Sequence, residues 1–347
     1  MKYVAVILIA LLAISSGCFF FNSLKKAKTQ PLSIVQRYNE WKLKFGKLYA
    51  TPSENGFRME VFADSFKEIE GFNAEYEEQV ALRGLPQLSG PMFALQKHSD
   101  LTRSEFEATM LGLKLPEEFV LEDYVAPAKP EAPKTLGQSG FQTRPRNQGA
   151  CGSCWAFSTI SVTEKFYYDQ YKIQVDLSQQ DLVNCAPGNG CGGGLPSVAM
   201  SHIGTSGVAQ ATTVPYVGSQ RVCATDTSRR LTMGAKWGVK QYAWTPAATT
   251  NANAAGVWAG IAVAASPRFY ALSKTDDVYL AEASGECNNA INHAVTAIGS
   301  PSAGVISVLN SWGDTWAVNG VKKIKACHNQ LIWGSPSPFM HPYASFS

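Results

Sequence analysis

The sequence of 347 residues predicts an α+β protein, with helices in its first half and strands in its second half. Residues 31–115 combine many charges with helical periodicity. A run free of Gly and Pro extends from Cys154 to Tyr171, and its positions repeat at helical spacing, which predicts a mostly buried helix. The residues that repeat are Ala156, Ile160, Thr163 and Tyr167. Beyond residue 257, short apolar runs have the length of strands.

The chain begins with Lys2 and an apolar stretch, Val4–Ile14. This length suits the core of a signal peptide and is too short to span a bilayer comfortably. We therefore predict a removed secretion signal over residues 1–22. The apolar continuation Cys18–Phe21 leaves an uncleaved anchor as the alternative, and Ser16–Cys18 is a weakly specific indication of lipidation.

A first helix is predicted around residues 54–73, where one set of side chains falls within roughly a 100° arc. The set is Glu54, Arg58, Phe62, Ser65, Ile69 and Asn73. An amphipathic helix of an unrelated helical domain is the alternative interpretation. Residues 116–139 then contain four prolines among Ala, Glu and Lys, which predicts an extended linker and a domain boundary near 125–135.

Three strands are predicted in the C-terminal part, each a short apolar run bounded by Gly, Pro or Ser. They are Gly260–Ala264, Ala294–Ile298 and Val305–Leu309.

The overall charge is nearly balanced, with 30 Lys and Arg against 27 Asp and Glu and a net charge of +3. This gives no reason to expect a nucleic-acid partner. The length exceeds that of one modest core, so two or more folding units, or a domain with a long appended segment, are expected.

Four motifs indicate the chemistry: NQGACGSCWAF at 147–157, CGGG at 191–194, NHAV at 292–295 and NSWGDTW at 310–316. Together they place one Cys, one His and one Asn in separate contexts, the pattern of a cysteine nucleophile with a base and an orienting amide.

These motifs also have interpretations other than a cysteine nucleophile. The tetrad from Cys151 to Cys154 has the spacing of a redox dithiol or of half a zinc site, and a lone His in an apolar run is more often structural. A redox pair would need neither Gln148 nor the later His and Asn motifs. A zinc site would need a second close pair, whereas Cys185 and Cys191 have no His nearby. We therefore expect no metal and no cofactor.

The motifs resemble those of the papain and cathepsin family of cysteine peptidases, and the helix face around 54–73 resembles the cathepsin L-like propeptide, with Ser65 in place of an Asn. The resemblance implies a two-lobed papain-like fold, a helical lobe plus an antiparallel β-barrel-like lobe, preceded by a helical propeptide. After the signal peptide at 1–22, it implies an inhibitory propeptide at 23–130, with the Pro-rich linker at its end, and a peptidase domain at 131–347.

A second propeptide motif is matched partly at 93–100, where Ala94, Gln96 and His98 depart from the family and Asp100 is kept. Ala317 also departs, because a glycine is usual there.

The resemblance also implies a role for each polar site residue. Cys154 would be the nucleophile, with its pKa lowered by a helix N-terminus and by the imidazolium of His293, which then protonates the leaving amine. Asn310 would orient the His ring and Trp312 would shield that bond. The side chain of Gln148 and the backbone N–H of Cys154 would stabilise the oxyanion.

The substrate groove is implied in the same way. Gly193 and Gly194 would let an extended peptide approach for backbone hydrogen bonding. An apolar second subsite, formed by Leu195, Ile291 and Ala294, would select a hydrophobic residue two positions before the scissile bond.

The cysteine count is consistent with a free thiol. Without Cys18 of the signal, seven of the eight cysteines remain, and an odd cysteine in a secreted chain suggests an unpaired, reactive one. The resemblance implies three disulfides and leaves Cys154 unpaired. The implied pairs are Cys151–Cys191, Cys185–Cys223 and Cys287–Cys327.

We therefore expect a cysteine endopeptidase of the secretory pathway, lysosomal, vacuolar or extracellular, made as a zymogen. Its partners would be protein and peptide substrates and its own propeptide, with no stable membrane association after signal removal. Acidification would weaken carboxylate contacts of the propeptide and start autoactivation. A catalytically silent binding protein and a thiol redox protein are the alternatives, and a count of free thiols separates the redox protein from the peptidase.

Overall fold

The computed structural model describes residues 31–114, 141–142, 144–224, 230–232, 258–284, 291–302, 304–325 and 333–334. The chain divides into two compact units, Met1–Ala50 and Thr51–Ser347. Several expectations lie outside the described residues: the signal at 1–22, the linker at 116–139, the pair Cys287–Cys327 and the tail after 327. Within the described residues, no helix combines the length and apolarity that crossing a bilayer requires.

The first unit contains helix α2 (Ile34–Phe45). Ser33 and Gln36 form a capping box, in which each side chain accepts a bond from the other residue's backbone N–H. Gly46 ends the helix with a φ of 62°, a left-handed conformation that glycine adopts at little cost.

In the second unit the predicted N-terminal helix is α3 (Pro52–Leu82), capped by Thr51 and begun by Pro52. Phe62 and Ile69, on the predicted face, are buried. Asn73 holds Phe93 through two bonds of 2.9 Å, one to the carbonyl and one from the amide. Helix α4 (Arg103–Met110) follows.

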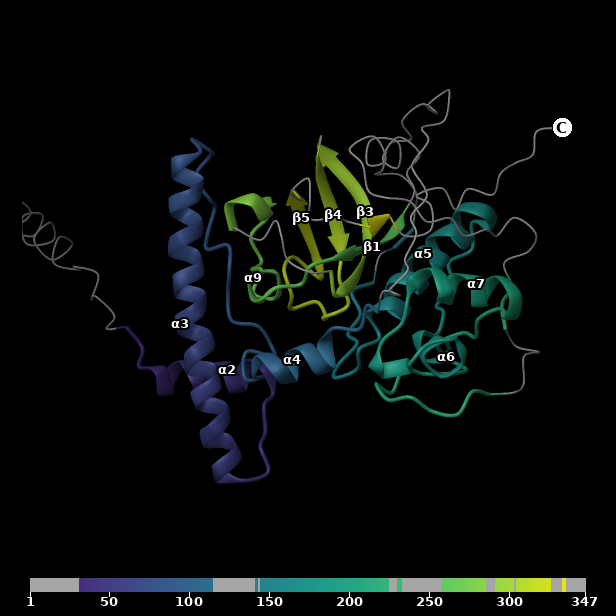
Figure 1. Cartoon of the computed structure of the whole chain (residues 1–347), viewed down its shortest axis with the longest axis horizontal. Coiled ribbons are helices and arrows are strands. Elements are labelled where there is room, and N and C mark those ends of the chain that lie inside the picture. Colours follow the sequence, from purple (N-terminus) through teal and green to yellow (C-terminus); the bar gives the residue numbers. More distant parts are fainter. Residues whose placement is uncertain are drawn as a thin grey trace, which may run out of the picture. The chain divides into compact units, whose positions relative to one another are not determined.

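The helical lobe contains α5 (Cys154–Tyr171), α6 (Gln179–Cys185), the short helix η1 (Gly190–Gly192) and α7 (Pro196–Ser206), drawn in teal in Figure 1. The helix predicted from Cys154 to Tyr171 is confirmed with these bounds. Its residues 154–166 are all buried, so α5 is the central helix of this lobe.

The strand lobe contains a six-stranded sheet in the order β2-β5-β4-β3-β1-β6. Its neighbours pair antiparallel except β2 with β5. The predicted strands correspond to β1, β3 and β4 (Figure 1). β3 extends beyond the predicted run to Ser302, and its register with β4 shifts after Ala297. The elements are β1 (Ala259–Val263), α9 (Pro267–Tyr270), β2 (Tyr279–Leu280), η2 (Ala281–Ser284), β3 (His293–Ser302), β4 (Val305–Leu309), β5 (Val321–Lys325) and β6 (Trp333–Gly334).

The two lobes meet where α5 packs on β3 and β1. Ser158, one turn after Cys154, donates to the carbonyl of Val295 at 2.9 Å. Since β3 begins at His293, this bond holds the first turn of α5 beside the first residues of β3.

The N-terminal segment packs on the strand lobe through rings. Phe93, at 1% exposure, meets Tyr76 at 5.5 Å and Tyr279 at 6.0 Å between ring centroids. The hydroxyl of Tyr76 also accepts from the amide of Leu280 at 2.8 Å. We call this the docking region, meaning α3 and residues 88–100 with the strand-lobe residues that they contact.

Ala317, where a glycine was expected, has a φ of 45°. A left-handed conformation costs an L-residue with a Cβ roughly 1 kcal/mol. The departure from the family therefore leaves a strained backbone position beside the buried ring of Trp316.

Candidate active site

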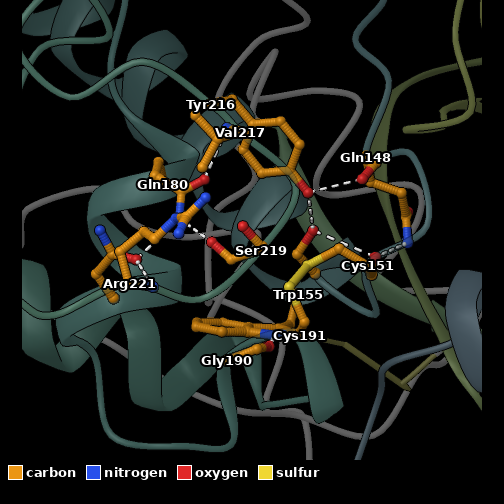
Figure 2. Close-up of a disulfide and its surroundings, with 12 residues drawn as sticks. Gln148, Cys151, Trp155, Gln180, Gly190, Cys191, Tyr216, Val217, Ser219 and Arg221 are labelled. Atoms are coloured by element: carbon orange, nitrogen blue, oxygen red, sulfur yellow. Dashed lines mark hydrogen bonds between the residues drawn. A yellow bond between two sulfur atoms is a disulfide. The ribbon is translucent and has the colours of Figure 1, made fainter.

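Cys154 is the first residue of α5 and is fully buried. It is the free cysteine of the described residues. The neighbouring Cys151 is joined to Cys191 by a disulfide (Figure 2), which fixes the turn before the helix. The amide of Ala294 points at the sulfur of Cys154, with N and Sγ 3.5 Å apart. The thiol at the start of α5 thus lies against the start of β3.

His293 begins β3 and pairs with Val263 of β1. Its Nε2 lies 2.8 Å from Oδ1 of Asn310. The ring of Trp312 stacks on the imidazole at 4.5 Å with an angle of 23°, so the bond to Asn310 is covered. Nδ1 has no hydrogen-bond partner among the described residues. One ring nitrogen is therefore held by an amide and the other is available for the chemistry.

Burial has opposite effects on the two groups. It raises the pKa of the Cys154 thiol to about 11, although bonds from backbone amides, that of Ala294 foremost, act in the other direction. It lowers the pKa of His293 to about 4, opposed by the bond to Asn310. Burial therefore disfavours the charged form of both groups in this closed site.

Gln148 is fully buried, and its side chain is oriented by Ser311. The hydroxyl of Ser311 donates to Oε1 at 2.6 Å, and Nε2 donates to the carbonyls of Cys151 at 2.8 Å and Met110 at 3.0 Å. Ser311 is also bound to Asn310, whose Oδ1 accepts from its amide at 2.8 Å. The amide that orients His293 and the side chain of Gln148 therefore share one scaffold.

Residues 110–114, the crossing segment, run over this site and contact Gln148 and Cys154. Gly112 and Lys114 bind both backbone polar groups of Gly194. The N–H of Gly194 donates to the carbonyl of Gly112 at 2.9 Å, and the N–H of Lys114 donates to the carbonyl of Gly194 at 3.3 Å. From the other side, Leu113 N donates to Asn292 O at 3.2 Å. The segment spans both lobes and covers Cys154 with backbone.

Two glycines make this close crossing possible. A Cβ on Gly112 would lie 1.8 Å from the carbonyl oxygen of Gly152, a distance that no side chain can occupy. A Cβ on Gly194 would lie 2.7 Å from the ring of Trp155. Both positions therefore require glycine for steric reasons.

Leu113 of the crossing segment packs into an apolar cluster beside Cys154, which we call the apolar pocket. The pocket residues come from both lobes and include the three expected from the resemblance together with Ala262 of β1; they are Leu195, Ile291, Ala294 and Ala262. Ala262 pairs with Ala294 in the sheet, so strand register brings it here. Register cannot be derived from the local sequence, which is why sequence reasoning missed it.

The structure places the other expected residues as follows. Gly193 lies next to Gly194 with a φ of 117°, and its carbonyl accepts from Asn189. Trp312 is 2% exposed and lies beneath Phe106 of α4, with ring centroids 5.6 Å apart. Cys185 and Cys223 form a second disulfide, beside the buried guanidinium of Arg230. No group of three or more His, Cys, Asp or Glu in the described residues could hold a metal ion.

Known families match most of the chain. Residues 135–333 match the papain family cysteine protease, and residues 38–106 match the cathepsin propeptide inhibitor domain. Chymopapain from Carica papaya is 29% identical over 328 residues, covering 90% of this chain and 88% of the relative. Digestive cysteine proteinase 1 from Homarus americanus is 30% identical over 305 residues, covering 84% and 90%.

Solved structures share the fold. Digestive procathepsin L 3 from the larval midgut of Tenebrio molitor matches with a TM-score of 0.68 and 23% identity, covering 88% of this chain and 99% of that one. A recombinant stem bromelain precursor matches with a TM-score of 0.63 and 24% identity, covering 84% and 92%. Both are precursor forms, so the similarity extends to the N-terminal segment.

Proposed function

Because the chain belongs to the papain family of cysteine proteases and carries a cathepsin propeptide inhibitor domain, we propose that Cys154, His293, Asn310 and Gln148 are its catalytic residues. The observation that carries the proposal is the arrangement around His293. One ring nitrogen is bound by Asn310 under Trp312, and the sulfur of Cys154 contacts the amide next to the ring. A nucleophile, a base and an orienting group are thus adjacent.

In this mechanism the thiol of Cys154 passes its proton to Nδ1 of His293, and the thiolate attacks the carbonyl carbon of the scissile peptide. The oxyanion that forms accepts hydrogen bonds from Nε2 of Gln148 and from the backbone N–H of Cys154. When the C–N bond breaks, the imidazolium donates its proton to the departing amine. Water then hydrolyses the thioester, with His293 as the base.

The propeptide keeps this chemistry latent in two ways. The crossing segment occupies the position of a substrate, with the Met110 carbonyl on the Gln148 donor that the oxyanion would use. It also excludes water, and burial opposes the ion pair of thiolate and imidazolium. Removal of the segment would let water stabilise both charges.

The apolar pocket around Leu113 would select a hydrophobic residue two positions before the scissile bond. The support is that a leucine fills this pocket between Leu195, Ala262 and Ala294 in the precursor. A peptide library varied at that position should favour Leu, Phe and Val, and a preference for Arg would contradict the proposed specificity.

The proposed processing has a signal at 1–22, a propeptide at 23–130 and a mature peptidase at 131–347. The secretory route, to a lysosome, a vacuole or the exterior, is supported by the disulfides Cys151–Cys191 and Cys185–Cys223, because such bonds persist in oxidising compartments. Sequencing the N-terminus of the secreted and the activated protein tests both cleavage positions.

The catalytic assignment is tested with variant precursors. An aspartic peptidase first removes the propeptide of each variant and is then separated from the product. Cys154→Ser and His293→Gln should each reduce hydrolysis of a peptide amide by at least about 10⁴-fold, because the nucleophile and its base act as a unit. Asn310→Ala, which removes only the orienting amide, should have a smaller effect. Cys151→Ser with Cys191→Ser is the matched control for redox chemistry, since it removes the disulfide and leaves Cys154. Retained activity in Cys154→Ser would refute the proposed function.

A further inference from the structure

Tyr216 places a hydroxyl group directly behind Gln148, and no sequence motif points to it. Its side chain comes from the loop that follows α7, in the helical lobe. The phenol donates to the backbone carbonyl of Gln148 at 2.7 Å, and the hydroxyl of Ser153 lies 2.7 Å from the same phenol oxygen. Figure 2 shows Tyr216 beside Gln148 and the disulfide of Cys151.

The direction of these bonds follows from counting protons. The carbonyl of Gln148 can only accept, so the single proton of the Tyr216 hydroxyl is used there. Because the phenol proton is used, the bond between the two hydroxyls requires Ser153 to be the donor. The other acceptor near the Ser153 hydroxyl, the Cys151 carbonyl, is more distant at 3.4 Å. Burial raises the pKa of Tyr216 to about 12, so the hydroxyl keeps its proton.

This chain of bonds joins the backbones that carry the two proposed oxyanion donors. Gln148 supplies one donor through its side chain. Ser153 precedes the other donor, because its carbonyl carbon is bonded to the amide nitrogen of Cys154. A single phenol oxygen therefore ties together the two backbone stretches whose separation sets the geometry of the oxyanion hole.

The phenol is itself held in place. Its ring packs edge-on against Phe157 of α5, with centroids 4.9 Å apart. Gln180 of α6 holds the following residues, accepting from Val217 N and donating to Ser219 O, both at 2.9 Å (Figure 2). Tyr216 thus connects the rigid helices of this lobe to the donors.

We infer that Tyr216 is a positioning residue whose hydroxyl fixes the spacing of the two oxyanion donors, an inference that rests on the proposed peptidase function. Donors of this kind act only when they are aimed at the place where the negative charge develops, and small displacements weaken them strongly. Supporting groups that lock such donors are therefore part of the catalytic design.

The test compares two reactions of Cys154 in the activated full chain. Peptide hydrolysis forms an oxyanion, whereas alkylation by iodoacetamide displaces iodide with the sulfur and forms none. Tyr216→Phe keeps the ring and removes one oxygen. We expect kcat/KM for a peptide amide to fall about tenfold or more, a part of the loss seen when a whole donor is removed, while the alkylation rate stays within about twofold.

Two further variants complete the test. Ser153→Ala should lower kcat/KM less than Tyr216→Phe, and the double variant should resemble Tyr216→Phe alone, because Ser153 acts through the phenol. Tyr167→Phe is the matched control, since this tyrosine lies on α5 and packs on Tyr171 away from Gln148. It should leave both reactions unchanged.

The inference is overturned if Tyr216→Phe leaves kcat/KM within about twofold of wild type, or lowers hydrolysis and alkylation equally, as a general loss of structure would. If Tyr216→Phe does not fold, as judged by thermal unfolding, Ser153→Ala decides: wild-type kcat/KM overturns the inference and a selective loss supports it. A different outcome marks failure of the proposed function itself: a wild-type protein that hydrolyses no peptide, or is alkylated elsewhere than at Cys154, refutes both.

Discussion

The propeptide meets the peptidase in two regions that differ in kind. The docking region buries rings, with Phe93 and Tyr76 at 1% and 0% exposure against the strand lobe. The crossing segment buries Met110 in the strand-lobe core and Leu113 between the lobes, and it adds backbone bonds through Gly112 and Lys114 across the site. Burial of apolar side chains contributes much binding free energy and does not depend on direction. Backbone hydrogen bonds across a cleft contribute less binding free energy but require a defined geometry. Affinity is therefore expected from the first region and blocking from the second.

One readout distinguishes these contributions: the rate at which a thiol-directed epoxide labels Cys154 in the intact precursor at neutral pH. The rate reports how often the cleft is uncovered, because the closed site is dry and blocked. A variant that weakens docking and a variant that spoils the crossing should both raise it, for different reasons and by different amounts.

The largest effect is expected from Phe93→Ala. Removal of a fully buried ring typically costs about 3–5 kcal/mol, which would raise the labelling rate more than about a hundredfold. Phe57→Ala is the control, because Phe57 lies on the same N-terminal segment but is 46% exposed. A similar rate for Phe93→Ala and Phe57→Ala would show that docking does not provide the affinity.

A smaller effect is expected from Gly112→Ala, since only the crossing is disturbed. The new methyl group meets backbone of Gly152, so the segment must lift from Cys154, and labelling should accelerate about tenfold. Gly71→Ala is the matched control: this glycine lies inside α3 with nothing within 4 Å of the added methyl group. It should stabilise the helix by about 0.5–1 kcal/mol and leave latency intact. Unchanged labelling in Gly112→Ala would contradict the blocking role.

A pH effect should come from His293. In the closed site its pKa is lowered to about 4 from 6.5, so the closed form binds fewer protons than an open form with an ordinary histidine. The closed form is therefore favoured fully above 6.5 and loses this advantage as the pH falls through 6.5 toward 4, by at most about 1.4 kcal/mol per pH unit. Acid opening then follows from the covered histidine.

This pH effect is measured by amide hydrogen exchange of Leu113 and Lys114 in a Cys154→Ala precursor, which cannot process itself, after correction for the intrinsic rate. Protection should fall between pH 6.5 and 4. The Cys154→Ala/His293→Gln precursor, with no group to titrate there, should show a flatter profile. Identical profiles would remove His293 as the acid sensor.

The smallest effect is expected from Glu105→Gln, which breaks the pair with Arg58 inside the propeptide. The bond to Arg58 lowers the pKa of Glu105 to about 2 from 4.5, so its contribution is complete above 4.5 and is lost only as the pH falls toward 2. Because the Glu105 side chain is 37% exposed, solvent screening limits the cost at neutral pH to about 1 kcal/mol.

Thermal unfolding of the Cys154→Ala precursor, with and without Glu105→Gln, tests this at several pH values. The difference in stability between the two proteins should persist at about pH 5 and vanish near pH 2. Glu107→Gln, which affects an exposed pair with Arg103, is the control. A difference already gone at about pH 5 would make this carboxylate an acid trigger, as first expected from the carboxylate-rich sequence.

Much of the fold could be predicted because its pattern is local. The helix from Cys154 to Tyr171 has continuous periodicity, and β4 is a clean apolar run. The strand β5, sequence VKKIK, was not predicted, because its lysines interrupt the apolar run that would indicate a strand. Lys322 is buried there and its amine reaches the carbonyl of Thr275 at 2.8 Å.

The site was predictable only in part, for a related reason. Cys154, His293 and Asn310 stand in distinctive contexts, whereas Tyr216 and Ala262 act through a backbone carbonyl and through strand register. Neither leaves a pattern in its own neighbourhood. The crossing at Gly112 could not be predicted either, because the requirement for glycine comes from Gly152, which is far away in the sequence and close in space.

The central claim is that Cys154 is the nucleophile and that the crossing segment keeps it covered. The most direct measurement labels the wild-type chain with a thiol-directed epoxide before and after activation and maps the modified residue by mass spectrometry. We predict negligible labelling of the precursor at neutral pH, and one label for each activated chain, on Cys154. Labelling of another residue, or equal labelling of Cys154 before and after activation, would contradict the account.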